Sequence, residues 1–148
     1  MKIKVAIIYT SKTGNTKELA EMVYYKFLNF NVKVDIISIK NFDASILSKY
    51  DIVSIGTYTW GNGEIPKEMV RVYRSMECMS GKRIISGVFG TGDSFYEHFC
   101  GAVDKFRDML YVRSTLAATL KVELSPQLQD VDRVDRFVKA LINKYKTI

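Results

Sequence analysis

The stretch TSKTGNT, residues 10–16, combines hydroxyl side chains with a glycine and an asparagine, and it directly follows the apolar run VAIIY. Hydroxyl groups donate hydrogen bonds to phosphate oxygens. The first amide N–H groups of a helix have no partner within that helix, and they lie at the positive end of its dipole. If residues 10–16 lead from a strand into a helix, they are therefore equipped to hold a phosphate group.

Two further stretches combine glycines with aromatic side chains: TYTWGNGEIP at residues 57–66 and GTGDSFYEH at residues 90–98. Gly61 and Gly63 permit positive φ angles, which favours a sharply turned loop. Taken alone, residues 57–66 are explained equally well by a tight turn whose aromatic side chain folds back onto the core. Because residues 90–98 repeat the arrangement, we favour a site for a flat ring, stacked on aromatic faces and bonded at its edge by loop amides.

The rest of the sequence alternates apolar, β-branched runs with segments of helical periodicity, which predicts parallel β-α-β units. Strands are expected at residues 5–9, 32–39, 51–59, 83–90 and 116–124. Helices are expected at residues 13–30, 65–76, 97–112 and 131–145, with a turn or two of helix between the second and third strands. Thr13 or Asn15 is the expected cap of the first helix.

We expect a single α/β domain over residues 1–148, with a five-stranded parallel sheet between two layers of helices. The three glycine-containing stretches follow the first, third and fourth predicted strands. In open sheets of this kind, ligands bind beyond the carboxyl ends of the strands. All three stretches should therefore converge on one ligand, which would carry both a phosphate and a flat ring.

The composition limits the classes of function. No apolar run approaches the ~20 residues needed to span a bilayer, which favours a cytoplasmic protein without a membrane partner. The net charge is +6, but the basic residues are spread among acidic ones along the chain, which argues against a dedicated nucleic-acid reader. A protein partner with an acidic face fits this charge better. Cys78 and Cys100 belong to no metal-binding or disulfide pattern, so we expect reduced thiols.

Three motifs together resemble the flavodoxins of the short-chain type: SKTGNT as the phosphate loop, TYTWGNG as the second flavin loop and GTGDSFYEHFCGAVDKF as the third. The resemblance covers essentially the whole chain. It implies a doubly wound sheet of strand order 2-1-3-4-5 that binds flavin mononucleotide (FMN). It further implies a monomeric, low-potential one-electron carrier without substrate turnover, which shuttles electrons between a reductase-type donor and an acceptor enzyme.

The resemblance also implies which residues bind FMN. The phosphate would be held by the first loop, consisting of Thr10, Ser11, Lys12, Thr13, Gly14, Asn15 and Thr16. The flavin would be bound by a second set, Thr57, Tyr58, Thr59, Trp60, Gly61 and Asn62, and by a third set, Gly90, Thr91, Gly92, Asp93, Phe95 and Tyr96. Trp60 would cover one face of the ring and Tyr96 the other, and the peptide between Gly61 and Asn62 would reorient on reduction. Asp93 would line the pyrimidine edge, cap the following helix, or do both.

Two departures from the family pattern concern charge. Flavodoxins are usually acidic, and an Asp commonly follows the flavin-loop glycine, where this chain has Asn62. Lys12 adds a positive charge within the phosphate loop, although it is explained equally well as a solvated side chain. We therefore predict a less negative potential for the second electron than in an acidic relative, because nearby positive charge stabilises the anionic reduced flavin. His98, the only histidine, is either a sensor of the flavin redox state or a surface residue.

Other functions fit less well. A P-loop nucleotidase needs Lys-Ser or Lys-Thr after its second glycine, where this chain has Asn15. A quinone reductase needs an open ring face, which aromatic side chains on both faces would block. The remaining alternative is a basic, flavodoxin-like activator protein for a ribonucleotide reductase.

Overall fold

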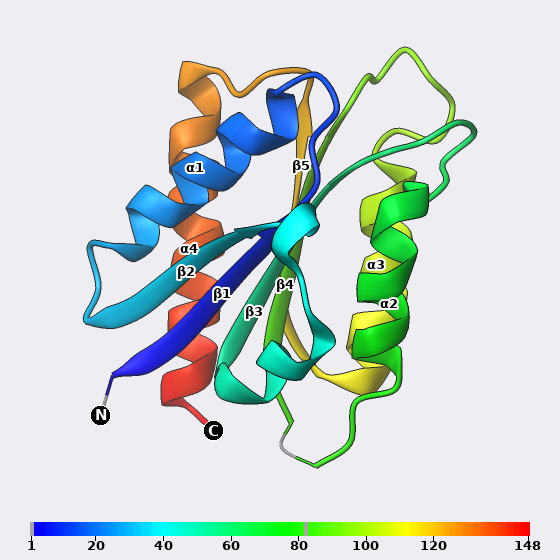
Figure 1. The fold of residues 1–148 in the computed structure, drawn as a ribbon. Helices are drawn as coiled ribbons and strands as arrows, with labels where there is room; N and C mark the ends of the chain where they lie inside the picture. The colour runs from blue at the N-terminus through cyan, green and yellow to red at the C-terminus, as the bar shows by residue number, and fades with distance from the viewer. Residues whose placement is uncertain (1, 82) are drawn as a thin grey trace.

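The computed structural model of the chain describes residues 2–81 and 83–148. At its centre lies a parallel sheet of five strands in the order β2-β1-β3-β4-β5 (Figure 1). The strands are β1 Ile3–Tyr9, β2 Val32–Ser38, β3 Ile52–Tyr58, β4 Ile85–Gly92 and β5 Thr115–Glu123. The helices are α1 Asn15–Phe27, α2 Val70–Glu77, α3 Gly101–Arg113 and α4 Val131–Lys146. The predicted fold class and strand order are confirmed.

The sheet separates two apolar cores. Helices α1 and α4 cover one face, and α2 and α3 cover the other (Figure 1). Successive side chains of a strand point to opposite faces, so β1 supplies Val5 and Ile7 to the α1–α4 core and Ala6 and Ile8 to the other. All four are completely buried, which explains why this strand is a continuous apolar run. Among the described residues, no helix is both long and apolar enough to cross a membrane.

Short 3₁₀ segments complete the connections. The link between β2 and β3 contains η1 Ile39–Asn41 and η2 Ala44–Lys49, which confirms the predicted turn or two of helix. Two others precede helices: η3 Lys67–Met69 leads into α2, and η4 Leu128–Asp130 leads into α4.

The first helix begins later than predicted and is capped differently. It starts at Asn15 rather than residue 13, because Gly14 before it has a left-handed φ of 98°. Neither Thr13 nor Asn15 accepts the cap bonds. Instead, the Ser11 hydroxyl oxygen accepts from the amides of Gly14, at 3.2 Å, and Lys17, at 3.1 Å. The Ser11 side chain thus connects the loop to the first turn of α1.

The next two helices also begin later than predicted. Pro66 has an extended backbone and disfavours helix at the residue before it, so η3 starts at Lys67 and α2 only at Val70. Helix α3 begins at Gly101 instead of residue 97, because Cys100 has a left-handed φ of 52°. His98 therefore lies in the loop and not in the helix.

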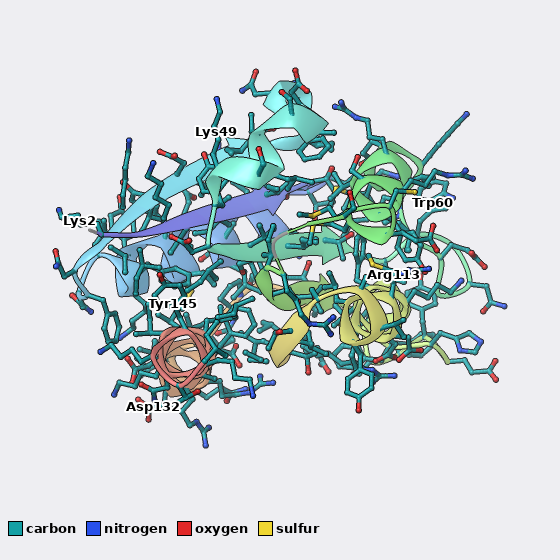
Figure 2. All side chains as sticks on the ribbon, turned by 90° about the horizontal axis from the view of Figure 1, so that it is seen from below. Lys2, Lys49, Trp60, Arg113, Asp132 and Tyr145 are labelled. Atoms are coloured by element: carbon teal, nitrogen blue, oxygen red, sulfur yellow. The ribbon has the colours of Figure 1, made fainter. Side chains whose placement is uncertain are left out.

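The loops after β1, β3 and β4 leave the sheet at the same end (Figure 1). Figure 2 shows Lys2, just before β1, and Trp60, just after β3, at opposite ends of the sheet. The three predicted binding stretches therefore share one rim of the molecule, as parallel strand topology requires.

Candidate functional site

The loop after β1 presents unpaired amides at the start of α1. The N–H groups of Lys12, Thr13, Asn15 and Thr16 have no hydrogen-bond partner among residues 2–81 and 83–148. They lie at the positive end of the α1 dipole, after a glycine in the left-handed conformation. Successive free amides around such a turn form a concave site for an anion.

A carboxylate that the sequence analysis missed connects this loop to the end of β3. The Thr10 hydroxyl donates to Glu68 Oε2 at 2.8 Å, and the Tyr58 hydroxyl donates to the same oxygen at 2.7 Å. Thr10 is buried, and its amide donates to the Gly56 carbonyl. Both Thr10 donors are thus used within the protein, so its role is to hold the loop in place.

A second tie joins the first and third loops. The hydroxyls of Thr16 and Thr91 lie 2.7 Å apart and are both buried. In the second loop, the Thr59 hydroxyl accepts from the Ala102 amide in the first turn of α3, at 3.3 Å. The Thr57 hydroxyl is buried and donates to the Tyr58 carbonyl. The Thr16–Thr91 pair therefore holds the first loop to the third, and Thr59 holds the second loop to α3.

The second loop is a tight antiparallel hairpin. Trp60 and Glu64 exchange two backbone hydrogen bonds of 2.8 and 2.7 Å, which leaves residues 61–63 as the tip. Gly61 and Gly63 have φ angles of 50° and 85°, which confirms the predicted positive values. Gly63 is buried against α3: a Cβ on Gly101 would lie 2.8 Å from Gly63 Cα. Gly61 has open space around it, so one end of the tip packs against α3 and the other end does not.

The third loop begins with glycines packed too closely for a side chain. A Cβ on Gly90 would lie 2.5 Å from the Thr57 carbonyl oxygen, and one on Gly92 would lie 2.9 Å from Cys100 Sγ. Asp93 Oδ1 accepts from the Phe95 amide at 2.9 Å within a local turn. Because α3 begins only at Gly101, the prediction that Asp93 caps this helix is wrong.

These loops enclose a cavity of about 450 Å³, within the usual range of small-molecule sites. Of the predicted first-loop residues, Lys12, Thr13 and Asn15 line it, whereas Thr10, Ser11, Gly14 and Thr16 do not. The second loop contributes Tyr58, Thr59, Trp60, Gly61 and Asn62, and the third contributes Thr91, Gly92, Asp93 and Tyr96. Phe95 is 90% exposed and does not line the cavity, and Thr57 and Gly90 are buried outside its lining. The cavity residues that were not predicted as binding residues are Gly63, Glu97, His98, Cys100 and Leu124.

The aromatic side chains at the cavity are not folded into the core. Trp60 is 51% exposed and Tyr96 is 66% exposed, which rules out the interpretation of residues 57–66 as a turn with a core aromatic. The Lys12 ammonium lies 4.4 Å from the centre of a Trp60 ring, a cation–π contact that joins the first and second loops.

Three titratable groups at or next to the cavity, Glu68, Tyr58 and Cys100, have shifted pKa values. Partial desolvation opposes the ionisation of Glu68, but hydrogen bonds from Tyr58 and Thr10, with the nearby Lys12 charge, hold the pKa of the Glu68 carboxyl below its usual value. Burial and the Glu68 carboxylate raise the pKa of Tyr58 to about 12. Burial also raises the pKa of Cys100 to about 12, so this thiol stays protonated and unreactive.

The donors present fit a phosphate that carries a flat ring. Residues with free amides at a helix start and two exposed aromatic side chains line the same cavity. FMN carries both a phosphate and a flat ring.

Known proteins resemble this chain in sequence and fold. The flavodoxin family model matches residues 7–132. A probable flavodoxin 1 of Bacillus subtilis is 34% identical, with 94% of this chain and 90% of the relative covered. A flavodoxin of Maridesulfovibrio salexigens is 35% identical over 86% of this chain and 91% of its own. The structure of a flavodoxin from Streptococcus pneumoniae TIGR4 superposes with a TM-score of 0.87 at 36% identity, covering 95% of this chain and 99% of that one. The chain therefore belongs to the flavodoxin family of FMN-binding electron-transfer proteins, which do not turn over a substrate of their own.

Proposed function

We propose that the protein is a low-potential one-electron carrier that binds FMN in the cavity between the three loops. The phosphate would be held by the unpaired amides of Lys12, Thr13, Asn15 and Thr16 and by the side chains of Thr13 and Asn15. The unpaired amides at the start of α1 are the observation that carries this assignment. The hydroxyls of Thr10 and Thr16 would hold the loop in place and would not contact the phosphate, because both make hydrogen bonds within the protein.

The ring would lie between Trp60 and Tyr96, whose exposed aromatic faces line the same cavity. Bound FMN supplies the redox chemistry, since its ring accepts and releases electrons one at a time. The hairpin tip would bond the edge of the ring. Gly63 is seated against α3, while Gly61 has open space, so the peptide between Gly61 and Asn62 can reorient without moving the base of the loop.

Local charge would tune the potentials. The cavity is lined by the cation Lys12 and by the carboxylates Asp93 and Glu97, while the neutral Asn62 occupies the hairpin tip. A single charge about 8 Å from the ring changes the energy of the reduced state by about 0.5–2 kcal/mol at an effective dielectric of ~20–80. We therefore expect Lys12 and Asn62 to make the potential of the second electron less negative than in relatives with an acidic loop.

The partners would be a reductase-type donor and an acceptor enzyme with an acidic face. The cavity lining itself carries both signs of charge, so the net charge of +6 resides mainly on the surrounding surface. Such charge steers a partner by long-range attraction rather than by contact at the flavin. Action as a monomer in the cytoplasm is part of this proposal.

Anaerobic reduction in small steps, followed by the visible absorbance of the holoprotein, tests the proposal. A one-electron carrier should give two separate one-electron steps with distinct spectra, and the second step should have the lower potential. A single two-electron step would contradict the proposed function. Adding oxygen to the reduced protein, with and without a ribonucleotide reductase subunit, would distinguish the carrier from the activator considered above.

A further inference from the structure

Leu124, the first residue after β5, has a left-handed backbone with a φ of 54°. Among the non-glycine residues of 2–81 and 83–148, only Cys100 shares a positive φ. Both residues line the cofactor cavity. Backbone strain of this kind persists only where the surrounding structure enforces it, and it clusters at functional sites.

The protein's own packing does not explain why a leucine occupies this position. The left-handed conformation brings the Cβ of an L-residue close to the next carbonyl oxygen, at a cost of roughly fivefold to thirtyfold in a folding equilibrium constant. Glycine would avoid that cost. Cys100 is 1% exposed and packs beneath Gly92, whereas Leu124 remains 49% exposed and gains little from burial.

A backbone hydrogen bond holds Leu124 at the cavity. Its amide donates to the Gly92 carbonyl at 2.7 Å, directly after the last paired residues of β4 and β5, Gly92 and Glu123. Gly92 itself lines the cavity at the start of the third loop. The position of Leu124 is therefore fixed relative to the loop that carries Tyr96.

We propose that Leu124 contacts bound FMN and forms an apolar wall of the cavity on the side of β5. The isobutyl group becomes buried only when the flavin is present, and it excludes water from that part of the ring. This assignment rests on the proposed function and adds the end of β5 to the three flavin loops. Leu124 then keeps a strained backbone in the free protein because its side chain is needed for contact with the cofactor.

Two variants separate the side chain from the strain. Leu124→Ala removes the isobutyl group and keeps a Cβ in the left-handed conformation, whereas Leu124→Gly removes both. Leu128→Ala is the control, because Leu128 follows in the same connection, is 90% exposed and lies outside the cavity lining. For each protein, FMN is titrated into the apoprotein, and the urea midpoint of the apoprotein is measured separately.

We expect both Leu124 variants to bind FMN about tenfold more weakly than the wild type. The Leu124→Gly apoprotein should nevertheless unfold at a higher urea concentration than the Leu124→Ala apoprotein, by at least fivefold in the unfolding equilibrium constant. A residue with a purely structural role would not combine higher stability with weaker binding. Leu128→Ala should match the wild type in both measurements.

If both Leu124 variants bind FMN as tightly as the wild type, the contact with the flavin does not exist. If Leu124→Gly is no more stable than Leu124→Ala, the strain argument fails and the inference with it. A wild-type chain that did not bind FMN would instead contradict the proposed function.

Discussion

The two ends of the cavity are built differently. At the phosphate end, side-chain hydrogen bonds fix the first loop: Ser11 accepts from two amides, Thr16 meets Thr91, and Thr10 donates to Glu68. At the ring end, Trp60 and Tyr96 are exposed. The base of the hairpin is held by backbone hydrogen bonds, the Thr59 hydroxyl and the Lys105–Glu64 ion pair, while Gly61 at its tip has open space around it.

The two ends therefore have different roles. We call the phosphate end, around Ser11 and Thr16, the anchor, and the ring end, with the hairpin tip at residues 61–63, the adjustable clamp. A preformed anion site can bind without ordering its own loop, which lowers the entropic cost of binding. The ring end must instead accommodate a cofactor whose charge and protonation change with each electron. Substitutions at the two ends should therefore affect different measurements.

The largest loss of stability is expected where the hairpin packs against α3, at the contact between Gly63 and Gly101. In Gly101→Ala the new Cβ would lie 2.8 Å from Gly63 Cα and 2.9 Å from its carbonyl oxygen, and this backbone has no flexible atoms to yield. We expect a loss of about 3 kcal/mol in the free energy of unfolding, measured in urea, and weaker FMN binding. Wild-type stability in this variant would show that the hairpin is not seated on α3.

At the anchor, Thr16→Val should destabilise the apoprotein by about 2 kcal/mol, because it leaves the buried Thr91 hydroxyl without a partner. The double variant Thr16→Val/Thr91→Val is the matched control. It should recover part of the loss, since two apolar groups then face each other. Additive losses in urea unfolding would contradict a direct bond between the two hydroxyls.

At the clamp, Gly61→Val should change the potential of the first electron by tens of millivolts. A β-branched residue at φ 50° costs about 1–2 kcal/mol, and a tenfold change in a one-electron equilibrium is about 59 mV. Gly81→Val is the control, because Gly81 also has a positive φ and open space but does not line the flavin cavity. The control should lose stability and keep the wild-type potential. Equal potentials in both variants would contradict an adjustable hairpin tip.

The charge of Lys12 should affect the second electron most. Lys12→Gln removes the cation near the ring, so we expect a more negative second potential, by an energy of about 0.5–2 kcal/mol. Lys2→Gln changes the net charge equally at the opposite end of the sheet (Figure 2), and it should leave the potential nearly unchanged. Identical shifts in a redox titration of both variants would point to net charge rather than local placement.

The smallest expected effect is a pH dependence from Glu68. Its folded-state pKa lies below the ordinary value of 4.5, so its stabilising contribution is present above that value and is lost as the pH falls through the folded-state pKa. Between about pH 7 and about pH 4, the wild type should therefore lose slightly more stability in urea than Glu68→Gln. An equal loss in both proteins would mean that the two hydroxyl bonds do not favour the ionised carboxyl.

The sequence predicted the order of the elements and the three loops because both depend on local patterns. Apolar runs identify the strands, and glycines with hydroxyl or aromatic neighbours identify the turns at their ends. Helix starts were predicted less well. Pro66 and the left-handed Cys100 shift two of them, and nothing local signals a positive φ at a cysteine.

The residues that were missed act over long distances in the chain. Glu68 is separated by 58 positions from Thr10, and its sequence context is an ordinary helix start. Leu124 resembles any other apolar residue at the end of a strand. Its significance depends on a backbone conformation and on a cavity that only the assembled sheet creates.

The central claim is that one cavity binds the FMN phosphate at the start of α1 and places the ring beside Trp60. The chain contains a single tryptophan, so selectively excited tryptophan emission reports on this position alone. FMN added to the apoprotein should quench the tryptophan emission at one equivalent, and riboflavin, which lacks the phosphate, should bind far more weakly. Unchanged emission with FMN, or equal affinity for riboflavin, would contradict the account.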